Sequence, residues 1–292
     1  MRKYAYWVIA AVLMALMIAG CSKGTPYPGA VNGAKAPLTI QVIDVGQGDA
    51  ILIRASGQVT LVDTGDVPAR EKLVSYIKNQ GITTIDKVII THPHADHLGG
   101  MNSILENFTV KHVYDSGQTT TTPMYRQYLT TIRKKNIPFT VLLAGSQIDI
   151  GGETVLKIFN PDKPYIVGES DLNNNSVVAK LIYGSFSMLL AGDAEHEAEA
   201  RMLEKYSGEL KSTVLKSGHH GSSTSSTPAF LKAVTPEVAI ISVGANNDYH
   251  HPHPSTLKKY ADLKYKVYRT DKDGTVTITS DGQTYTITKE KQ

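Results

Sequence analysis

Ten histidines occur in the chain of 292 residues, and eight of them fall in three short stretches. The densest stretch is Thr91–His97, with the sequence THPHADH, which holds three imidazoles and one carboxylate. The other two are His219–His220 and His250–His253. Imidazole and carboxylate groups spaced this closely form a donor set that suits zinc, manganese or iron. The clustering therefore predicts a metal centre rather than a set of scattered structural histidines.

The spacing within this first motif divides its side chains into two pairs. His92 and His94 are two residues apart at the end of an apolar strand, so their side chains point the same way. Asp96 and His97 follow on the next turn, at the expected start of a helix. Four ligands from one corner cannot complete two metal sites, so further donors are expected downstream.

Three other stretches supply such donors. Asp193 follows a buried strand, and a carboxylate at this position can bridge two cations about 3.5–4 Å apart. His219 and His220 end another strand on a turn flanked by glycines. Upstream, Asp63 is placed to accept the distal N–H of a metal-bound histidine, which would fix the orientation of that ligand. Together these residues predict a two-metal site made of nitrogen and oxygen ligands.

Short apolar strands alternate with amphipathic helices from Leu38 onward, and they would carry these residues. The β-rich runs lie at 38–45, 50–55, 59–65, 87–92, 154–161, 176–184, 186–193, 212–221 and 238–245, and the helical patterns at 68–81, 98–108, 122–136, 195–207 and 254–263. A final β-meander is expected over 266–270, 274–282 and 284–289. This order predicts sheets covered by helices in one domain, with the candidate ligands at strand ends.

The N-terminus has the layout of a bacterial lipoprotein signal peptide. Arg2 and Lys3 precede an apolar run from Ala5 to Ala19, and the sequence IAGC at Ile18–Cys21 resembles a lipobox. We therefore expect residues 1–20 to be removed. The alternative is an uncleaved membrane anchor with an incidental cysteine. Both interpretations place the folded part outside the cytoplasm and attach it to a membrane.

Cys21 is the only cysteine, and we expect it to carry the lipid. Residues 21–36 are rich in Gly, Pro and small polar residues and are predicted to form a flexible tether to a folded domain at 37–292. The folded domain then contains no thiol, so thiolate ligands and disulfides are excluded.

The overall charge gives no general attraction for nucleic acid. The formal net charge of +3 falls to +1 without Arg2 and Lys3. A polyanionic substrate would therefore have to be bound locally. After the N-terminal run no apolar segment is long enough to span a bilayer, so we expect no DNA channel in this chain.

The ordered motifs resemble those of metallo-β-lactamase-fold hydrolases, and one branch in particular. That branch is the C-terminal extracytoplasmic domain of the ComEC DNA-uptake family, with its free-standing relatives. The resemblance starts near Leu38 and continues almost to the C-terminus. The motifs that carry it are DVGQGDA (44–50), LVDTG (61–65), THPHADH (91–97), NNNSVVAKLIYG (173–184), LLAGDAE (189–195), KSGHHGS (216–222) and VGANNDYHHPHP (243–254). The resemblance implies an α+β fold, a four-layer αββα sandwich in a single domain, with metals at the edge of two facing sheets.

Matched residue by residue, the resemblance implies two divalent metal ions, zinc or manganese. His92 and His94 would bind one ion, Asp96 and His97 would bind the other, and Asp193 would bridge them.

The two later histidine stretches would complete the site. His219 or His220 would be a further ligand of the second ion, and we favour His219, with His220 as its outer or catalytic partner. Asp96 would also orient the attacking water. We expect His251 to contact a phosphoryl oxygen or protonate a leaving group, and His253 to mark the start of a helix.

One departure from the wider superfamily concerns the pair His92 and His94. Many members supply another histidine between the first motif and the bridging aspartate. Here the one candidate is His112, which lies in a strand without a motif around it. Asn174 or Asn175 would line the site instead, so the first metal position would be open to water and substrate.

These expectations describe an extracytoplasmic, lipid-anchored, metal-dependent hydrolase in which a water activated by two cations attacks phosphorus. An anionic phosphodiester, with DNA as the first candidate, is the expected substrate, and the sequence identifies no protein partner. The alternatives are a hydrolase of cell-wall phosphodiesters or phosphorylcholine esters, then of a lactone or β-lactam, and finally a non-catalytic binding protein on the same fold.

Overall fold

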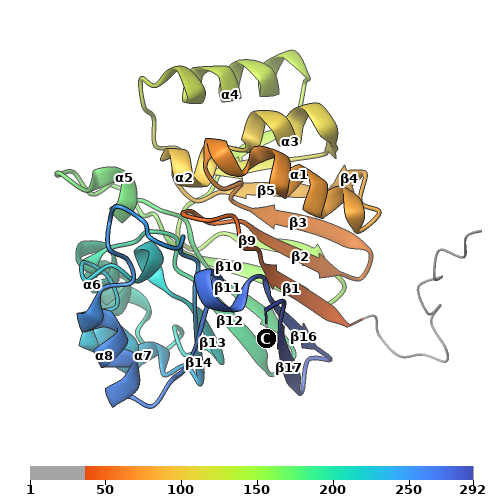
Figure 1. Ribbon diagram of the computed structural model, residues 1–292. Coiled ribbons are helices and arrows are strands. Elements are labelled where there is room, and N and C mark those ends of the chain that lie inside the picture. The colour runs from red at the N-terminus through yellow and green to blue at the C-terminus, as the bar shows by residue number, and fades with distance from the viewer. Residues whose placement is uncertain (1–36, 292) are drawn as a thin grey trace, which may run out of the picture. The chain divides into compact units, whose positions relative to one another are not determined.

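Two β-sheets face each other in the computed structural model, which describes residues 37–291 (Figure 1). The predicted signal peptide, the lipidated Cys21 and the tether lie outside the described residues. Within residues 37–291, no helix is both long enough and apolar enough to cross a membrane.

The first sheet has eight strands. Their order across the sheet is β17 (Tyr285–Lys289), β16 (Val276–Ser280), β1 (Leu38–Val42), β2 (Ile51–Ala55), β3 (Gln58–Val62), β5 (Lys87–Ile90), β7 (Val113–Asp115) and β8 (Phe139–Val141). The strands from β17 to β3 pair antiparallel, whereas β3, β5, β7 and β8 run parallel. A separate short ladder joins β4 (Thr84–Ile85) to β6 (Thr109–Val110).

The second sheet has seven strands. Their order is β15 (Lys266–Arg269), β14 (Val238–Ile241), β13 (Val214–Lys216), β12 (Phe186–Leu190), β11 (Val178–Tyr183), β10 (Thr154–Asn160) and β9 (Gln147–Gly151). The strands from β12 to β15 are parallel, and the others pair antiparallel.

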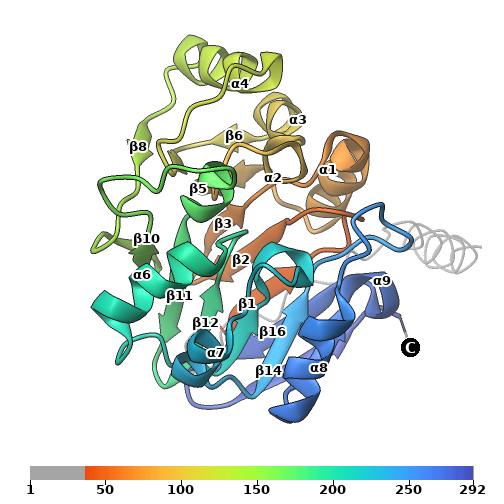
Figure 2. The same cartoon turned by 90° about the vertical axis from the view of Figure 1, so that its left-hand side faces the viewer.

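Helices cover the outer face of each sheet. Figures 1 and 2 show α1, α3 and α4 beside the first sheet and α6, α7 and α8 beside the second. The helices and short turns are η1 (Val67–Ala69), α1 (Arg70–Asn79), α2 (Ala95–Leu98), α3 (Met101–Asn107), α4 (Pro123–Lys134), α5 (Asp171–Asn174), α6 (His196–Tyr206), η2 (Gly218–Gly221), α7 (Pro228–Val234), α8 (Pro254–Asp262) and α9 (Thr270–Asp273).

The central strands are buried on both faces because their residues contribute to two apolar layers. On β2, Ile51 and Ile53 join the core between the sheets, whereas Leu52 packs toward α1 and α3. A third cluster fills the space between the second sheet and α6–α8. A fully buried Leu or Ile stabilises the fold by about 1.5–3 kcal/mol, so these layers hold the sheets together. The predicted αββα sandwich is thus confirmed.

The predicted final meander is wrong. Lys266–Arg269 (β15) pairs parallel with β14 in the second sheet, whereas Val276–Ser280 and Tyr285–Lys289 form a hairpin on β1 of the first sheet. Between them, α9 ends at Gly274, whose φ of +68° lets the chain change direction. The three runs are close in sequence, yet the chain crosses from the second sheet to the first between β15 and β16.

The parallel strands bring the predicted ligands together. β3 and β5 of the first sheet and β12, β13 and β14 of the second are followed directly by Asp63, the Thr91–His97 motif, Asp193, His219–His220 and the loop that carries His251. Because carboxyl ends of parallel strands meet at one edge, residues far apart in sequence converge there.

Candidate metal centre

The Thr91–His97 corner is held by contacts from the loop before β2 and from Asp63. The backbone N–H and hydroxyl of Thr91 donate to the two carboxylate oxygens of Asp63 at 2.7 and 2.8 Å. Asp49 N–H donates to the Asp96 carbonyl at 3.1 Å. A Cβ at Gly48, where φ is +124°, would lie 2.3 Å from that carbonyl oxygen. Only glycine allows this approach, which fixes the backbone beneath Asp96.

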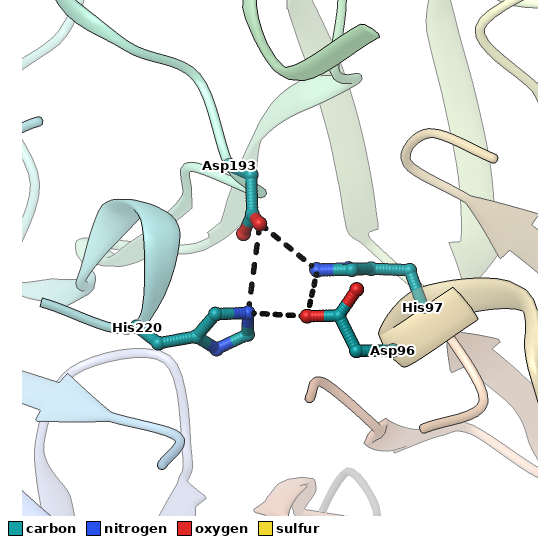
Figure 3. A group of neighbouring side chains, drawn as sticks. All are labelled: Asp96, His97, Asp193 and His220. Atoms are coloured by element: carbon teal, nitrogen blue, oxygen red, sulfur yellow. Dashed lines mark hydrogen bonds and ion pairs between the residues drawn. The ribbon is translucent and has the colours of Figure 1, made fainter. Parts of the chain in front are cut away.

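Four side chains from this corner and from the second sheet converge on one point (Figure 3). They are Asp96, His97, Asp193 and His220, and we call them the four-residue cluster. His220 Nε2 lies 3.0 Å from Asp96 Oδ2 and 3.5 Å from Asp193 Oδ2. His97 Nε2 lies 3.2 Å from Asp193 Oδ2 and 3.7 Å from Asp96 Oδ2. All four donor atoms lie within 4.8 Å of one another, a spacing at which one ion could contact each.

The other pair, His92 and His94, lies beside this cluster. His92 Nε2 is 3.0 Å from His94 Nδ1 and 3.8 Å from Asp193 Oδ2. Asp193 Oδ2 therefore lies within 4 Å of His92 as well as of His97 and His220. In the described part of the chain, the groups of donors close enough to hold an ion do not include His92 or His94.

The residues fit a cation because their polar atoms are buried without adequate partners. Asp193 is 2% exposed, and its Oδ1 has no hydrogen bond. A buried carboxylate oxygen without a hydrogen-bond donor or a cation beside it destabilises the fold. Divalent cations would supply the missing partners of these carboxylate and imidazole groups, which face one another.

The pKa values of these groups show how strong the local field is. Burial alone would lower the pKa of His97, but the carboxylates of Asp193, Asp96 and Asp63 hold it well above its usual value. The pKa of His220 is likewise lowered by burial but raised overall, to about 10, chiefly by Asp193. Burial and the positive charge of His97 lower the pKa of His92 well below its usual value. The cluster thus attracts positive charge at the position where a cation would lie.

The structure favours His220 over His219 as the further ligand. His220 belongs to the four-residue cluster, whereas His219 Nε2 is 3.8 Å from Asp193 Oδ2 and its Nδ1 lies 3.1 Å from Glu195 Oε1. Both histidines have a left-handed backbone, with φ of 47° and 52°, so consecutive side chains diverge from η2. The predicted preference for His219 did not allow for this turn.

Two buried carboxylates support the imidazoles from behind. The expected contact of Asp63 is present, with its Oδ2 2.8 Å from His97 Nδ1. Asp49 Oδ1 lies 3.5 Å from His220 Nδ1, which also contacts the Ser242 carbonyl at 3.0 Å. Lys216 Nζ is 2.8 Å from Asp49 Oδ2, and both side chains are almost fully buried. Sequence reasoning missed this ion pair, although a lysine at the end of an apolar strand was its signal.

A cavity of about 410 Å³ opens over the cluster. It is lined by Gln47, His94, Ala95, Asp96, Asn173, Asp193, His219, His220, Tyr249 and His251. The predicted His251 thus reaches the site. The asparagine that lines the cavity is Asn173, and not the expected Asn174 or Asn175. Asn175 bonds the backbone of Ile166 and Asp171, and Asn173 lines the cavity and donates to Glu195 at 2.9 Å.

Two further histidines named in the sequence analysis and one loop make structural contacts. His112 stacks on Tyr114 and contacts Thr140, at the edge of the first sheet. His253 is the N-cap residue of α8, as expected. In the Ser-rich loop at 221–226, hydroxyl groups bond within the protein, for example from Ser225 to the Ala194 carbonyl at 2.8 Å.

The fold and site define the class of protein. The sequence profile of the Metallo-beta-lactamase superfamily matches residues 43–245, and the chain belongs to this superfamily. Its members are mostly metal-dependent hydrolases, and the donor set at the strand ends places this chain among them.

The chain is also similar to particular proteins. It is 31% identical over 255 residues to ComE operon protein 3 of Bacillus subtilis (strain 168), and the aligned region covers 81% of this chain and 32% of that protein. It is 29% identical over 253 residues to Competence protein ComA of Neisseria gonorrhoeae, covering 85% and 33%. The chain therefore spans about a third of the length of these curated relatives. The predicted resemblance to the ComEC family is confirmed.

Among solved structures, the metallo-beta-lactamase fold protein YhfI from Bacillus subtilis is similar with a TM-score of 0.55 at 14% identity, covering 80% of this chain and 96% of that one. At this identity the likeness supports the fold alone.

Proposed function

We propose that this chain is a phosphodiesterase that cleaves DNA outside the cytoplasm with two divalent cations, zinc or manganese. The observation that carries the proposal is the four-residue cluster at the base of an open cavity, with His92 and His94 beside it. Two positions that share Asp193 suit a substrate whose attacked and leaving oxygens both need stabilisation.

In this proposal, one cation would be held by Asp96, His97, Asp193 and His220, which already lie close enough together for one ion. The other would be held by His92, His94 and Asp193, which would first have to move closer together, because they are not among the donor groups near enough to share an ion. The cations, when bound, would lower the pKa of water and neutralise charge on the phosphoryl group. Asp63 contacts His97 Nδ1 and the Ser242 carbonyl accepts from His220 Nδ1, so both imidazoles are oriented before a cation enters.

Two imidazoles remain for the substrate. His219 faces the cavity with Glu195 behind its Nδ1, which suits it to donate from Nε2 to the leaving oxygen. Burial first, and then the nearby charges of His219 and His220, lower the pKa of His251 to about 4. A neutral His251 at pH 7 suits contact with a phosphoryl oxygen better than protonation of a leaving group.

The choice of DNA rests on the relatives, which include a competence protein. Because this chain spans about a third of them, their whole activity is not transferred here. A panel of substrates tests the choice directly: plasmid DNA, bis-p-nitrophenyl phosphate, p-nitrophenyl phosphorylcholine and nitrocefin, with metal analysis of the same protein. We expect hydrolysis of the first two. Activity restricted to the choline ester would replace the proposal by a cell-wall esterase.

The location outside the cytoplasm is proposed from the sequence of residues 1–36 alone. Lipidation of Cys21 predicts incorporation of labelled palmitate in a bacterial host and its loss in Cys21→Ser. Equal labelling of both proteins would contradict the proposed anchor.

A further inference from the structure

Tyr249 is an exposed aromatic side chain at the mouth of the metal-site cavity. It is 64% exposed, and it lines the same cavity as Asp96, Asp193 and His220. Among the exposed large apolar side chains of residues 37–291, it is the one that borders this cavity. Its hydroxyl makes no hydrogen bond within the described residues, so no internal hydrogen bond explains a tyrosine rather than another aromatic residue here.

The ring nevertheless occupies a defined position. It lies nearly parallel to the ring of His251, with centroids 5.7 Å apart and 24° between the planes. His251 is in turn nearly parallel to His220 of the four-residue cluster, at 6.3 Å and 28°. The three rings form a series of aromatic faces that leads from the cluster to the surface.

The loop that carries these rings is braced. The side chain of Asn247 accepts from His251 N–H at 3.0 Å and donates to the His251 carbonyl at 2.7 Å and the Gly244 carbonyl at 2.9 Å. A braced loop presents the ring with little loss of conformational entropy on binding.

The chemistry of such a face beside a phosphodiester site favours a nucleobase. Every base has a flat π-face, and aromatic side chains bind unpaired bases by stacking without sequence preference. A quaternary ammonium group, as in choline, is instead recognised by a cage of several aromatic rings. Tyr249 is the single Phe, Tyr or Trp that lines this cavity, so a cage is absent from the described residues there.

We propose that Tyr249 is a stacking site for one base of a single-stranded nucleic acid whose phosphodiester lies at the metal centre. The inference rests on the proposed phosphodiesterase function and adds its substrate class. Bases within a duplex are already stacked on both faces, so the site selects single strands and frayed ends. Gln47 lines the same cavity, and because its Oε1 accepts from Gly244 N–H, its amide N–H groups are left to contact a base edge or a phosphate oxygen.

The test compares Tyr249→Ala with Tyr249→Trp on two oligonucleotides of equal length, one with bases and one built of abasic units. For the wild type we expect kcat/KM to be higher on the base-bearing strand. Tyr249→Ala should reduce the ratio of the two values by about 5- to 150-fold, the effect of one lost stack, and Tyr249→Trp should retain it. Phe139→Ala, which removes an exposed ring on β8, is the matched control and should leave the ratio unchanged.

A binding measurement separates this inference from the proposed function. Affinity for a fluorescent single strand is measured by anisotropy in Asp193→Asn protein, with and without Tyr249→Ala, so that no turnover is needed. A similar fold-loss on removing the ring supports the stacking site even if hydrolysis is absent. Equal affinities with and without Tyr249→Ala, or an equal loss of kcat/KM on the base-bearing and the abasic oligonucleotide, would overturn it.

Discussion

His219 and His220 show how one backbone feature divides two identical side chains between two tasks. Their left-handed conformations at φ 47° and 52° cost roughly 1–3 kcal/mol each, which the surrounding structure must offset. These conformations place His220 beside Asp96 and Asp193, and His219 beside Glu195.

Alanine at each position should separate these tasks. His220→Ala should weaken metal binding by more than about tenfold, because it removes a member of the four-residue cluster. His219→Ala should lower turnover but leave the metal content of the purified protein near that of the wild type. Metal analysis together with kcat on bis-p-nitrophenyl phosphate distinguishes them. Equal loss of metal from both variants would show that His219 is also a ligand.

Lys216 and Asp49 form a buried ion pair behind His220, and its removal should be costly. Lys216→Met leaves the Asp49 carboxylate buried without its partner, so we expect a loss of about 3–5 kcal/mol in the free energy of unfolding. The double variant with Asp49→Asn should recover part of that loss, because the uncompensated charge is gone. Urea unfolding of the two single variants and the double variant measures the coupling. Strictly additive losses would mean that the pair is energetically independent.

Asp115 ends β7, and its carboxylate couples that strand to α4. It accepts from Gly117 N–H at 2.7 Å and from the Tyr128 hydroxyl at 3.3 Å. Burial nevertheless raises its pKa to about 6. The Asp115 carboxyl group therefore binds its proton more tightly in the folded protein than in the unfolded chain. The stability that this protonation contributes is present below about pH 4 and is lost as the pH rises through 6.

Asp115→Asn removes the charge and keeps an acceptor for Gly117. Relative to wild type, the variant should gain about 2–3 kcal/mol between pH 4 and pH 7, the equivalent of about two pKa units. Urea unfolding of both proteins at the two pH values gives the difference. A difference in stability that does not change with pH would contradict the raised pKa.

Among the elements, those with strong local patterns could be predicted and those set by tertiary packing could not. The strands at 51–55 and 186–190 are apolar except for Arg54 and Ser187. Helix α4 begins at Pro123 after a Thr122 cap that accepts from Tyr125 N–H, so the sequence pattern identified all three elements. The strand Phe139–Val141 is exposed and three residues long, and it carries no such signal. At the site, the motifs located the candidate ligands. The contacts of His220 depend on the left-handed turn at His219 and His220, and no pattern in the sequence indicated that turn.

At the scale of the whole molecule, the site exists only when the two sheets are packed together. Asp63, Asp96 and His97 come from the first sheet and its loops, and Asp193 and His220 come from the second. A cation that binds this native arrangement and not the unfolded chain must stabilise the fold. At a cation concentration of 100 times Kd, we expect a rise in Tm of about 5–10 °C. Calorimetry with and without a chelator, with Asp262→Asn as the control for an exposed carboxylate, checks this.

The most direct test of a metal-dependent phosphodiesterase is a titration of the metal-free protein with Mn²⁺ or Zn²⁺. Bound metal and cleavage of single-stranded DNA are followed in the same samples, for the wild type and for Asp193→Asn. We expect cleavage to appear as metal binds and Asp193→Asn to lose at least about a thousandfold in rate, because the shared carboxylate is gone. Cleavage that persists without metal, or a wild type that binds neither ion, would contradict it.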